Sequence, residues 1–313
     1  MNQPRVASWR SLQAATRRTK HELRALARSA PRMYEPFDIL LGDKTRHIDN
    51  PKAELLEVQR CLLLFLRKTC PLDKSAHGGV PGRSPLTNAS SHQQGEIVAR
   101  ADIKNCFPSI SHKMVYNALT KRGFSPDLAS ITTKLTTLER RLPQGAPTST
   151  HLANLVIADA IEGVAGTPSV TTFVDDIAMS GEREDVTRSL FGVLRAIRAA
   201  GLKVRAKKVE LQAAHRGYVA ITGVGVRVPG VAPKKRKRLR TRLLALERQG
   251  TSTEAEWRSI VSTVAHVKSL NADQGHALER LASRVQKRLR LLPGGRKSTK
   301  TFVRCCSTKK HRA

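Results

Sequence analysis

Two adjacent acids near the middle of the chain, Asp175 and Asp176, lie between short apolar runs. The β-branched and aromatic residues 171–174 before them and the apolar residues 177–179 after them are typical of two strands. The pair is therefore expected at the tight turn of a hairpin, which holds both carboxylates near one point. Because two crowded anions repel each other, the turn is predicted to bind a cation, and we interpret it as part of a divalent-metal site.

The chain carries a large excess of positive charge, with 56 Lys and Arg against 25 Asp and Glu in 313 residues, a formal net charge of +31. A field of this size attracts polyanions, so nucleic acid is the expected partner and an anionic membrane surface the weaker alternative. No apolar run approaches the ~20 residues of a membrane span. Five cysteines without a CxxC pair fit a reducing cytosol, and we expect a cytoplasmic protein without a membrane partner.

A third acid, Asp102, ends a strand predicted over residues 96–103. Neighbouring strands of one sheet would bring it to Asp175 and Asp176. Carboxylate oxygens completed by phosphate oxygens are the ligands that Mg²⁺ prefers, and a pair of such ions is the arrangement of polymerases and nucleases. The three acids are therefore predicted to hold two Mg²⁺ ions, with Mn²⁺ as the alternative. For each aspartate taken alone, a cap of the following turn is the other interpretation.

Three stretches, 102–110, 142–149 and 173–176, resemble the ordered A, B and C motifs of reverse transcriptases. One such motif is a weak signal, whereas all three in this order and spacing are specific. The resemblance covers about residues 44–230 and implies an RNA-directed DNA polymerase of α+β class, shaped as a right hand. Its expected parts are a basic helical segment at 1–35, fingers and palm with an antiparallel sheet flanked by helices at 36–230, a helical RNA-binding thumb at 231–291 and a basic flexible tail at 292–313.

The same resemblance implies roles for individual residues. Asp102, Asp175 and Asp176 are the expected catalytic and metal-binding triad, and Phe107 is the expected ring that excludes a ribonucleotide 2′-OH. A turn that contacts template and incoming nucleotide, together with three cations near the phosphates, completes the nucleotide-binding set: Gln144, Gly145, Lys44, Arg46 and Lys208. Lys207 remains the alternative to Lys208.

Residues 88–92, Asn-Ala-Ser-Ser-His, match the NAxxH motif that marks bacterial retron reverse transcriptases, and residues 221–223 are similar to their VTG motif. This resemblance implies synthesis of branched multicopy single-stranded DNA (msDNA), primed from the 2′-OH of an internal guanosine. The implied partners are a cognate structured non-coding RNA, its cDNA product, dNTPs and a linked effector protein that acts in antiphage defence. The usual YADD motif of the family is FVDD here, which alters the neighbours of Asp175 on the side of the primer end.

RNA binding is expected at Asn88 and His92. For a lone His such as His92, a structural hydrogen-bonding residue is favoured over a metal ligand. RNA binding is also expected along a cationic run at the start of the helical module, for which a solvated helix face is the alternative: Lys234, Lys235, Arg236, Lys237, Arg238, Arg240 and Arg242.

Two other functions remain open. One is another reverse transcriptase class, either group II intron-like, diversity-generating or abortive-infection. The motif at 88–92 argues against it. The second is a non-catalytic, basic RNA-binding scaffold with a relic palm, against which the intact trio of aspartates argues.

Overall fold

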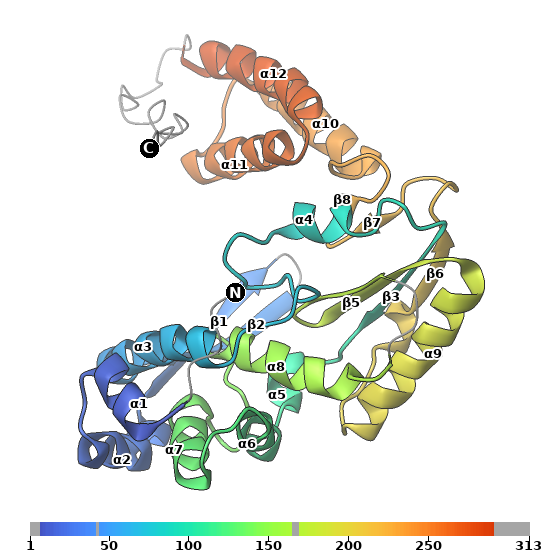
Figure 1. Cartoon of the computed structure of the whole chain (residues 1–313). Helices are drawn as coiled ribbons and strands as arrows, with labels where there is room; N and C mark the ends of the chain where they lie inside the picture. Colours follow the sequence, from blue (N-terminus) through green and yellow to red (C-terminus); the bar gives the residue numbers. More distant parts are fainter. Residues whose placement is uncertain (1–6, 42–43, 165–168, 291–313) are drawn as a thin grey trace, which may run out of the picture. The chain divides into compact units, whose positions relative to one another are not determined.

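The computed structural model describes residues 7–41, 44–164 and 169–290 (Figure 1). The chain divides into two compact units between Pro229 and Gly230, and each is described by itself. The sequence also predicts a turn at Gly42-Asp43. This turn and the basic tail predicted at 292–313 lie outside the described residues.

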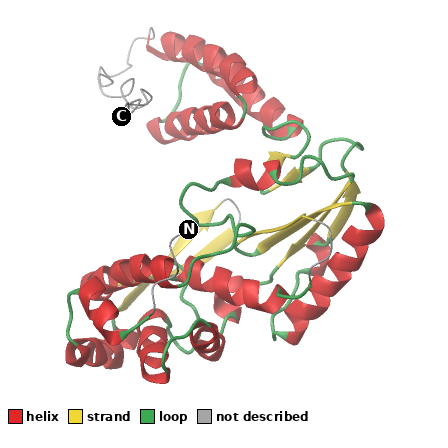
Figure 2. Ribbon diagram, viewed as in Figure 1, coloured by secondary structure: helices red, strands yellow, loops and turns green. Residues whose placement is uncertain are grey.

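The first unit is built on a four-stranded antiparallel sheet in the order β4-β5-β3-β6. The register of β3 against β5 makes Asp102 the direct partner of Asp176. Helix α9 packs along one face of this sheet against β3 and β5, as Figure 2 shows. The predicted α+β class with antiparallel strands and flanking helices is confirmed. The strands are β3 (Ile97–Asp102), β4 (Ser169–Phe173), β5 (Asp176–Gly181) and β6 (Glu210–Ala213).

Helices surround the sheet and share one hydrophobic core with it. The core includes Leu12 and Leu23 of the two N-terminal helices, so this basic segment is packed into the first unit. The helices of the unit are α1 (Trp9–Thr16), α2 (Lys20–Ser29), α3 (Ala53–Thr69), α4 (Pro85–Ser90), α5 (Cys106–Ser109), α6 (His112–Lys121), α7 (Pro126–Thr136), α8 (Ser149–Ile161) and α9 (Arg183–Ala199), with 3-10 turns at Ala30–Arg32 (η1) and Ala206–Lys208 (η2).

Side-chain caps set several helix starts. Ser111 accepts a hydrogen bond from the backbone N–H of Met114, and Ser125 caps α7 with Pro126 in its first turn, as the sequence predicts. Helix α8 begins without such a cap. The sequence predicts a cap from Thr148 or Ser149, but both hydroxyls are buried without a hydrogen-bond partner, so this prediction is wrong.

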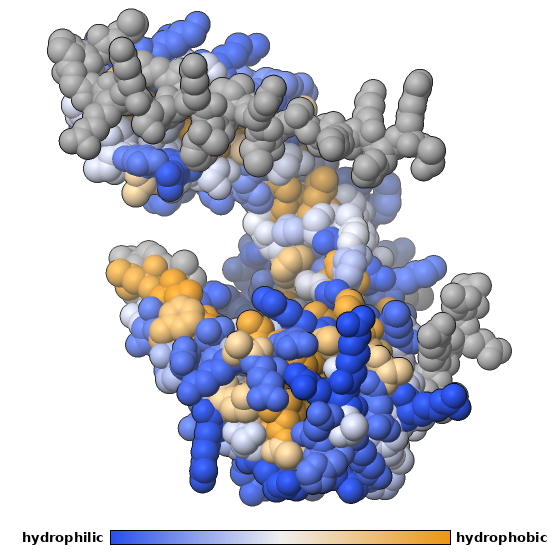
Figure 3. Space-filling model, turned by 90° about the vertical axis from the view of Figure 1, so that its left-hand side faces the viewer, coloured by the Kyte–Doolittle hydropathy of each residue, from blue (hydrophilic) through white to orange (hydrophobic). Residues whose placement is uncertain are grey.

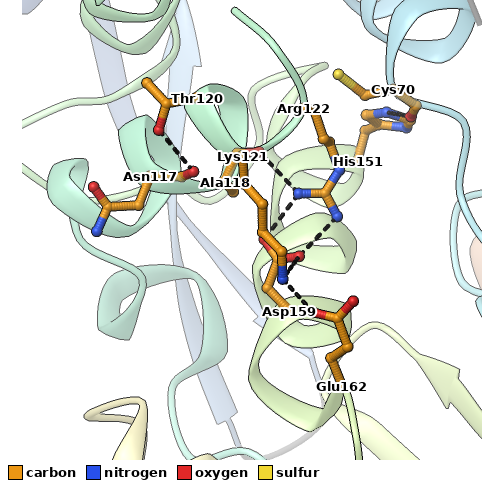
Figure 4. A network of polar contacts seen from close by, with 9 residues as sticks. All are labelled: Cys70, Asn117, Ala118, Thr120, Lys121, Arg122, His151, Asp159 and Glu162. Carbon is orange, nitrogen blue, oxygen red and sulfur yellow. Dashed lines mark hydrogen bonds and ion pairs between the residues drawn. The ribbon is translucent and has the colours of Figure 1, made fainter.

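An ion-pair network joins α6 to α8 (Figure 4). The Arg122 guanidinium donates to both carboxylate oxygens of Asp159, at 2.8 and 3.0 Å. Lys121 reaches the same carboxylate at 3.2 Å and also contacts Glu162. A bidentate Arg–carboxylate pair fixes both distance and orientation, so this contact holds α8 in register with α6.

Two short hairpins complete the first unit. Strands β1 (Tyr34–Leu41) and β2 (Lys44–Pro51) form one, with Ile39 opposite Arg46. Strands β7 (Ala220–Ile221) and β8 (Val224–Gly225) form the other, which packs against α4. The sequence predicts a loop for the polar, Gly- and Pro-rich segment 71–95, whereas the structure has the helix α4 within it. The view in Figure 3 shows a mostly hydrophilic face with separate apolar areas.

Within residues 230–290, the part of the second unit that the structure describes, there are three helices, and α10 and α11 both pack against α12. Its interior contains leucines and valines such as Leu243, Val264 and Val285. Across the described ranges, no helix is both long enough and apolar enough to cross a membrane. The helices are α10 (Pro233–Gln249), α11 (Glu254–Leu270) and α12 (Ala272–Arg290).

Candidate functional site

Three carboxylates meet at one end of the four-stranded sheet. Asp102 is the last residue of β3, and Asp176, its cross-strand partner, is the first residue of β5. Asp175 precedes it in the β4–β5 turn, where its carbonyl accepts a hydrogen bond of 2.9 Å from the backbone N–H of Ile103. The antiparallel ladder thus brings together acids that are far apart in the chain.

Two cations contact Asp102, whose residue is only 3% exposed. The Lys208 ammonium contacts Oδ2, and Nε of Arg205 lies 3.2 Å from Oδ1. That oxygen is buried and accepts no hydrogen bond. Of Lys207 and Lys208, it is Lys208 that reaches the acid.

Asp175 and Asp176 differ from Asp102 in their surroundings. Within the described part of the chain, no cation lies within ion-pair distance of either carboxylate. Burial raises the pKa of Asp175, and the charge of Asp102 adds to this. Burial also raises the pKa of Asp176, with the charges of Asp175 and Asp102 as further causes. A nearby positive charge would therefore stabilise the ionised form of each carboxylate.

The donor chemistry of these acids fits a divalent cation. In this conformation, the described residues contain no group of three or more His, Cys, Asp or Glu gathered closely enough to hold a metal. The buried Oδ1 of Asp102, which accepts no hydrogen bond, and the two partly buried acids with raised pKa values nevertheless offer the hard oxygen ligands that Mg²⁺ takes. Asp102, Asp175 and Asp176 are the residues that would hold it.

The predicted nucleotide turn contacts β2 directly. The backbone N–H of Asp49 donates to the Gln144 carbonyl at 2.8 Å, and the Gln144 N–H donates to the Asp49 carboxylate at 3.2 Å. Gly145 has a φ of +125°, and a Cβ there would lie 2.7 Å from Cγ2 of Ile48. Only glycine allows this close approach.

The same strand carries Arg46, whose charge lowers the pKa of Asp175 against the effect of burial. The side chain of Lys44 lies outside the described residues. Phe107, in α5, is half-buried and packs against the core. Asn105, two residues before it, has a left-handed conformation with a φ of 50°. The structure thus brings Arg46 and Lys208 toward the acids, and it joins Gln144 to the strand that carries Arg46.

Two residues of this site were missed in the sequence. Arg205 belongs to the alternation Lys203-Val204-Arg205, which predicts a strand whose cations share a face. Asp49 is an acid on the strand after Ile48, and only its 3% exposure reveals its structural importance. Neither residue carries a motif signal.

The two residues of the NAxxH motif lie inside the protein. Asn88 is 1% exposed and His92 is 0% exposed, so the direct RNA contact expected of them is not available in this structure. His92 instead makes hydrogen bonds to two strands, the structural alternative that residue type alone favours.

The cationic run lies on α10 of the second unit. Arg242 is paired with Glu256 at 3.1 Å. Arg236 is partly buried. The other members are exposed, and no ion pair to them occurs in the described ranges: Lys234, Lys235, Lys237, Arg238 and Arg240.

A family model described as "Reverse transcriptase (RNA-dependent DNA polymerase)" matches residues 42–242. The retron Mx65 reverse transcriptase of Myxococcus xanthus is 32% identical over 75% of this chain, which spans only 60% of that protein's length. The retron Se72 enzyme of Salmonella heidelberg is 27% identical, over 80% of this chain and 72% of its own. The retron Ec86 enzyme of Escherichia coli is 25% identical, over 83% of this chain and 86% of its own.

Among solved structures, a foamy viral protease-reverse transcriptase in complex with double-stranded DNA aligns with a TM-score of 0.46 and 18% identity, over 81% of this chain and 44% of that one. The family match covers the residues that form the three-carboxylate site. This chain belongs to the reverse transcriptase family of RNA-dependent DNA polymerases and is of the bacterial retron type.

Proposed function

We propose that this protein is the RNA-directed DNA polymerase of a retron, which synthesises branched msDNA from a cognate structured non-coding RNA. The observation that carries the proposal is the meeting of Asp102, Asp175 and Asp176 at the end of one antiparallel sheet. Proteins named as retron reverse transcriptases, similar over 75–83% of this chain, support the choice of substrate.

In this proposal the first unit acts as fingers and palm and the second as thumb. The hairpin β1–β2 is the fingers element, because it carries Arg46 and contacts the turn at Gln144 through Asp49. The sheet with the three acids is the palm. The three helices of the second unit would grip the template through α10.

Polymerisation joins a primer hydroxyl to the α-phosphorus of a dNTP, and the bond to the departing pyrophosphate breaks. Bound Mg²⁺ would supply Lewis acidity to this transfer in the two-metal manner of polymerases. Arg46 would neutralise charge on the triphosphate. Lys208 contacts Asp102 in this structure. Once the Lys208 ammonium is released from Asp102, it would neutralise charge on the pyrophosphate.

Two residues would select the nucleotide and align it. The half-buried ring of Phe107 would leave no room for an oxygen on C2′, so deoxynucleotides are preferred. The turn at Gln144 and Gly145 would meet the base pair between template and incoming nucleotide. Its double hydrogen bond to Asp49 limits how far it can move.

The RNA would bind the second unit through phosphate contacts. The exposed cations of α10 supply a positive surface of the kind that reads structured RNA by shape and backbone. Action with a linked effector in antiphage defence, in the bacterial cytoplasm, completes the proposal and rests on the retron type alone.

The test is to express the protein with the RNA encoded beside its gene and to sequence the nucleic acid that co-purifies. We expect cDNA joined to RNA by a 2′,5′ branch. The variant with both Asp175→Ala and Asp176→Ala should retain the RNA and make no cDNA.

Other outcomes separate the alternatives. Unbranched cDNA would identify another reverse transcriptase class. RNA without cDNA from the wild type would support a binding scaffold. Persistent cDNA in the double variant would refute the assignment of the acids.

A further inference from the structure

The segment 75–95, here called the strap, runs along the free edge of the four-stranded sheet. The backbone N–H of Thr172, in β4, donates to the carbonyl of Ser75 at 2.9 Å. The N–H of His77 donates to the carbonyl of Thr172 at 2.7 Å, so the strap pairs with β4 in parallel. The strap is therefore attached to the strand that leads into the turn with Asp175.

At its other end the strap inserts His92 between two strands. The imidazole Nε2 lies 2.7 Å from the Thr171 hydroxyl of β4, and Nδ1 lies 2.7 Å from the Ser180 hydroxyl of β5. Thr171 lies four residues before Asp175 (175 minus 171), and Ser180 lies four residues after Asp176 (180 minus 176). One buried ring thus ties together the two strands that carry the acids.

The chemistry of this contact suits a neutral imidazole, which donates through one nitrogen and accepts through the other. Burial, with a further contribution from the charge of His77, lowers the pKa of His92 to about 4. The ring is therefore neutral near pH 7. It can satisfy both hydroxyls without burying a charge.

The turn between the two strands is strained. Val174 has a φ of +59°, a left-handed conformation that a β-branched residue rarely adopts. Such strain persists only where the surroundings hold it. The strap lies directly against this residue, because a Cβ on Gly78 would be 2.6 Å from Cγ2 of Val174 and 2.7 Å from its backbone nitrogen.

We propose that the strap holds the strained Val174 turn through His92 and so sets the positions of Asp175 and Asp176. His92 is then a positioning residue of the active site and not an RNA ligand. This inference rests on the proposed function for the role of the two acids. It adds a structural reason for a buried histidine in the retron-type motif.

The first experiment compares His92→Asn with His151→Asn. His151 is a matched control, because it is 4% exposed and its pKa is also lowered to about 4, mainly by burial. Its ring bonds the Cys70 carbonyl at 3.1 Å instead of the β4–β5 hairpin (Figure 4). Binding of Tb³⁺ is measured by luminescence without nucleic acid. Polymerisation is measured on poly(rA)–oligo(dT) against Mg²⁺ and dTTP concentration.

We expect His92→Asn to weaken Tb³⁺ binding and to lower kcat on the order of tenfold, the effect typical of groups that orient metal ligands. The KM for dTTP should stay near its wild-type value, and His151→Asn should change neither quantity. Combined Thr171→Val and Ser180→Ala should reproduce the His92→Asn result, which guards against a fold defect specific to one variant.

A second arm uses Val174→Gly, which accepts a positive φ without strain. In this background, His92→Asn should weaken Tb³⁺ binding by a smaller factor than in the wild type. If the double variant loses Tb³⁺ affinity by the product of the factors measured for His92→Asn and Val174→Gly alone, the proposal is overturned. Equal losses in His92→Asn and His151→Asn would also overturn it, as would wild-type Tb³⁺ binding in His92→Asn combined with weaker RNA binding. If the wild type makes no cDNA while His92→Asn still weakens Tb³⁺ binding, the proposed function fails and the role of the strap stands.

Discussion

Asp102 and Asp176 are direct cross-strand partners at the end of the β3–β5 ladder. Like charges at directly opposed positions destabilise a sheet by roughly 0.2–1 kcal/mol. The cost falls mainly on Asp176, because Lys208 and Arg205 contact Asp102, whereas burial and the charges of Asp175 and Asp102 raise the pKa of Asp176. A residue that is costly for the fold in this way is typical of a position kept for function.

Replacing Asp176 by Asn should therefore stabilise the metal-free protein while abolishing DNA synthesis. We expect Tm to rise by about 1–3 °C without divalent metal, since one repulsive contact is removed. Millimolar Mg²⁺ should raise the Tm of the wild type and not that of the variant. Differential scanning fluorimetry with and without Mg²⁺ measures both effects. Glu184→Gln, an exposed acid on α9, serves as the charge-matched control, and a lower Tm in metal-free Asp176→Asn would contradict the prediction.

Asp49→Ala should impair nucleotide binding more than catalysis. The change leaves the Gln144 N–H without its acceptor, so the turn keeps only the backbone hydrogen bond from Asp49 and is held less firmly against β2. We expect a several-fold higher KM for dNTP and a loss of about 1–3 kcal/mol in the free energy of unfolding. Asp49→Asn keeps an acceptor oxygen, so its KM for dNTP and its free energy of unfolding should lie between those of the wild type and those of Asp49→Ala. Steady-state kinetics and urea denaturation provide the test, and an unchanged KM in the alanine variant would exclude the coupling.

Phe107→Ala should relax the choice between deoxy- and ribonucleotides. With the ring removed, an oxygen on C2′ finds space, and the preference for dNTP over rNTP in kcat/KM should fall by roughly tenfold or more. Single-nucleotide extension with matched dNTP and rNTP measures this ratio. Phe191→Ala, which removes a ring 66% exposed on α9, is the control. Equal discrimination in both variants would remove Phe107 from the nucleotide site.

The cationic run should govern the salt dependence of RNA binding. Neutralising Lys234, Lys235 and Lys237 to Gln should reduce the slope of log K against log salt by roughly 0.7–0.9 for each RNA phosphate that the variant no longer neutralises. Arg242→Gln should leave that slope nearly unchanged, because Arg242 is paired with Glu256. Filter binding of the cognate RNA at several salt concentrations measures the slope for the wild type, the triple variant and Arg242→Gln. A triple variant with the wild-type slope would assign the run to a solvated helix face.

The pH dependence of stability should report on His92. Its folded pKa of about 4 lies below the ordinary 6.5, so the unfolded chain binds the proton more tightly. The stabilisation from the neutral ring is present above about pH 6.5 and is lost as pH falls toward 4. For a shift from 6.5 to about 4, the free energy of unfolding should be lower by about 2–3 kcal/mol at pH 4.5 than at neutral pH. His151 contributes in the same direction. Urea denaturation between pH 7.5 and 4.5 should show a shallower loss in His92→Asn, and an identical loss in wild type and variant would contradict the buried neutral ring.

The local features of the site were predictable from sequence. The β-branched and aromatic run before Asp175-Asp176 and the apolar run after them predict a hairpin, and the structure has β4 and β5 there with the pair at the turn. The caps at Ser111 and Ser125 follow from residue type and position. These features depend on residues within one or two turns of each other, and short-range sterics and hydrogen bonding decide them.

By itself, the sequence determined the family, the class of fold and the type of chemistry, because ordered motifs and net charge are properties of the chain. Tertiary structure decided which of the candidate residues meet. It brought Lys208 and Arg205 to Asp102, joined Asp49 to Gln144, and enclosed His92 between two strands. Each of these contacts joins residues far apart in the chain, and only the packing of strands and helices fixes such distances. His92, which belongs to a recognisable motif, is therefore buried, although the motif predicts that it binds RNA.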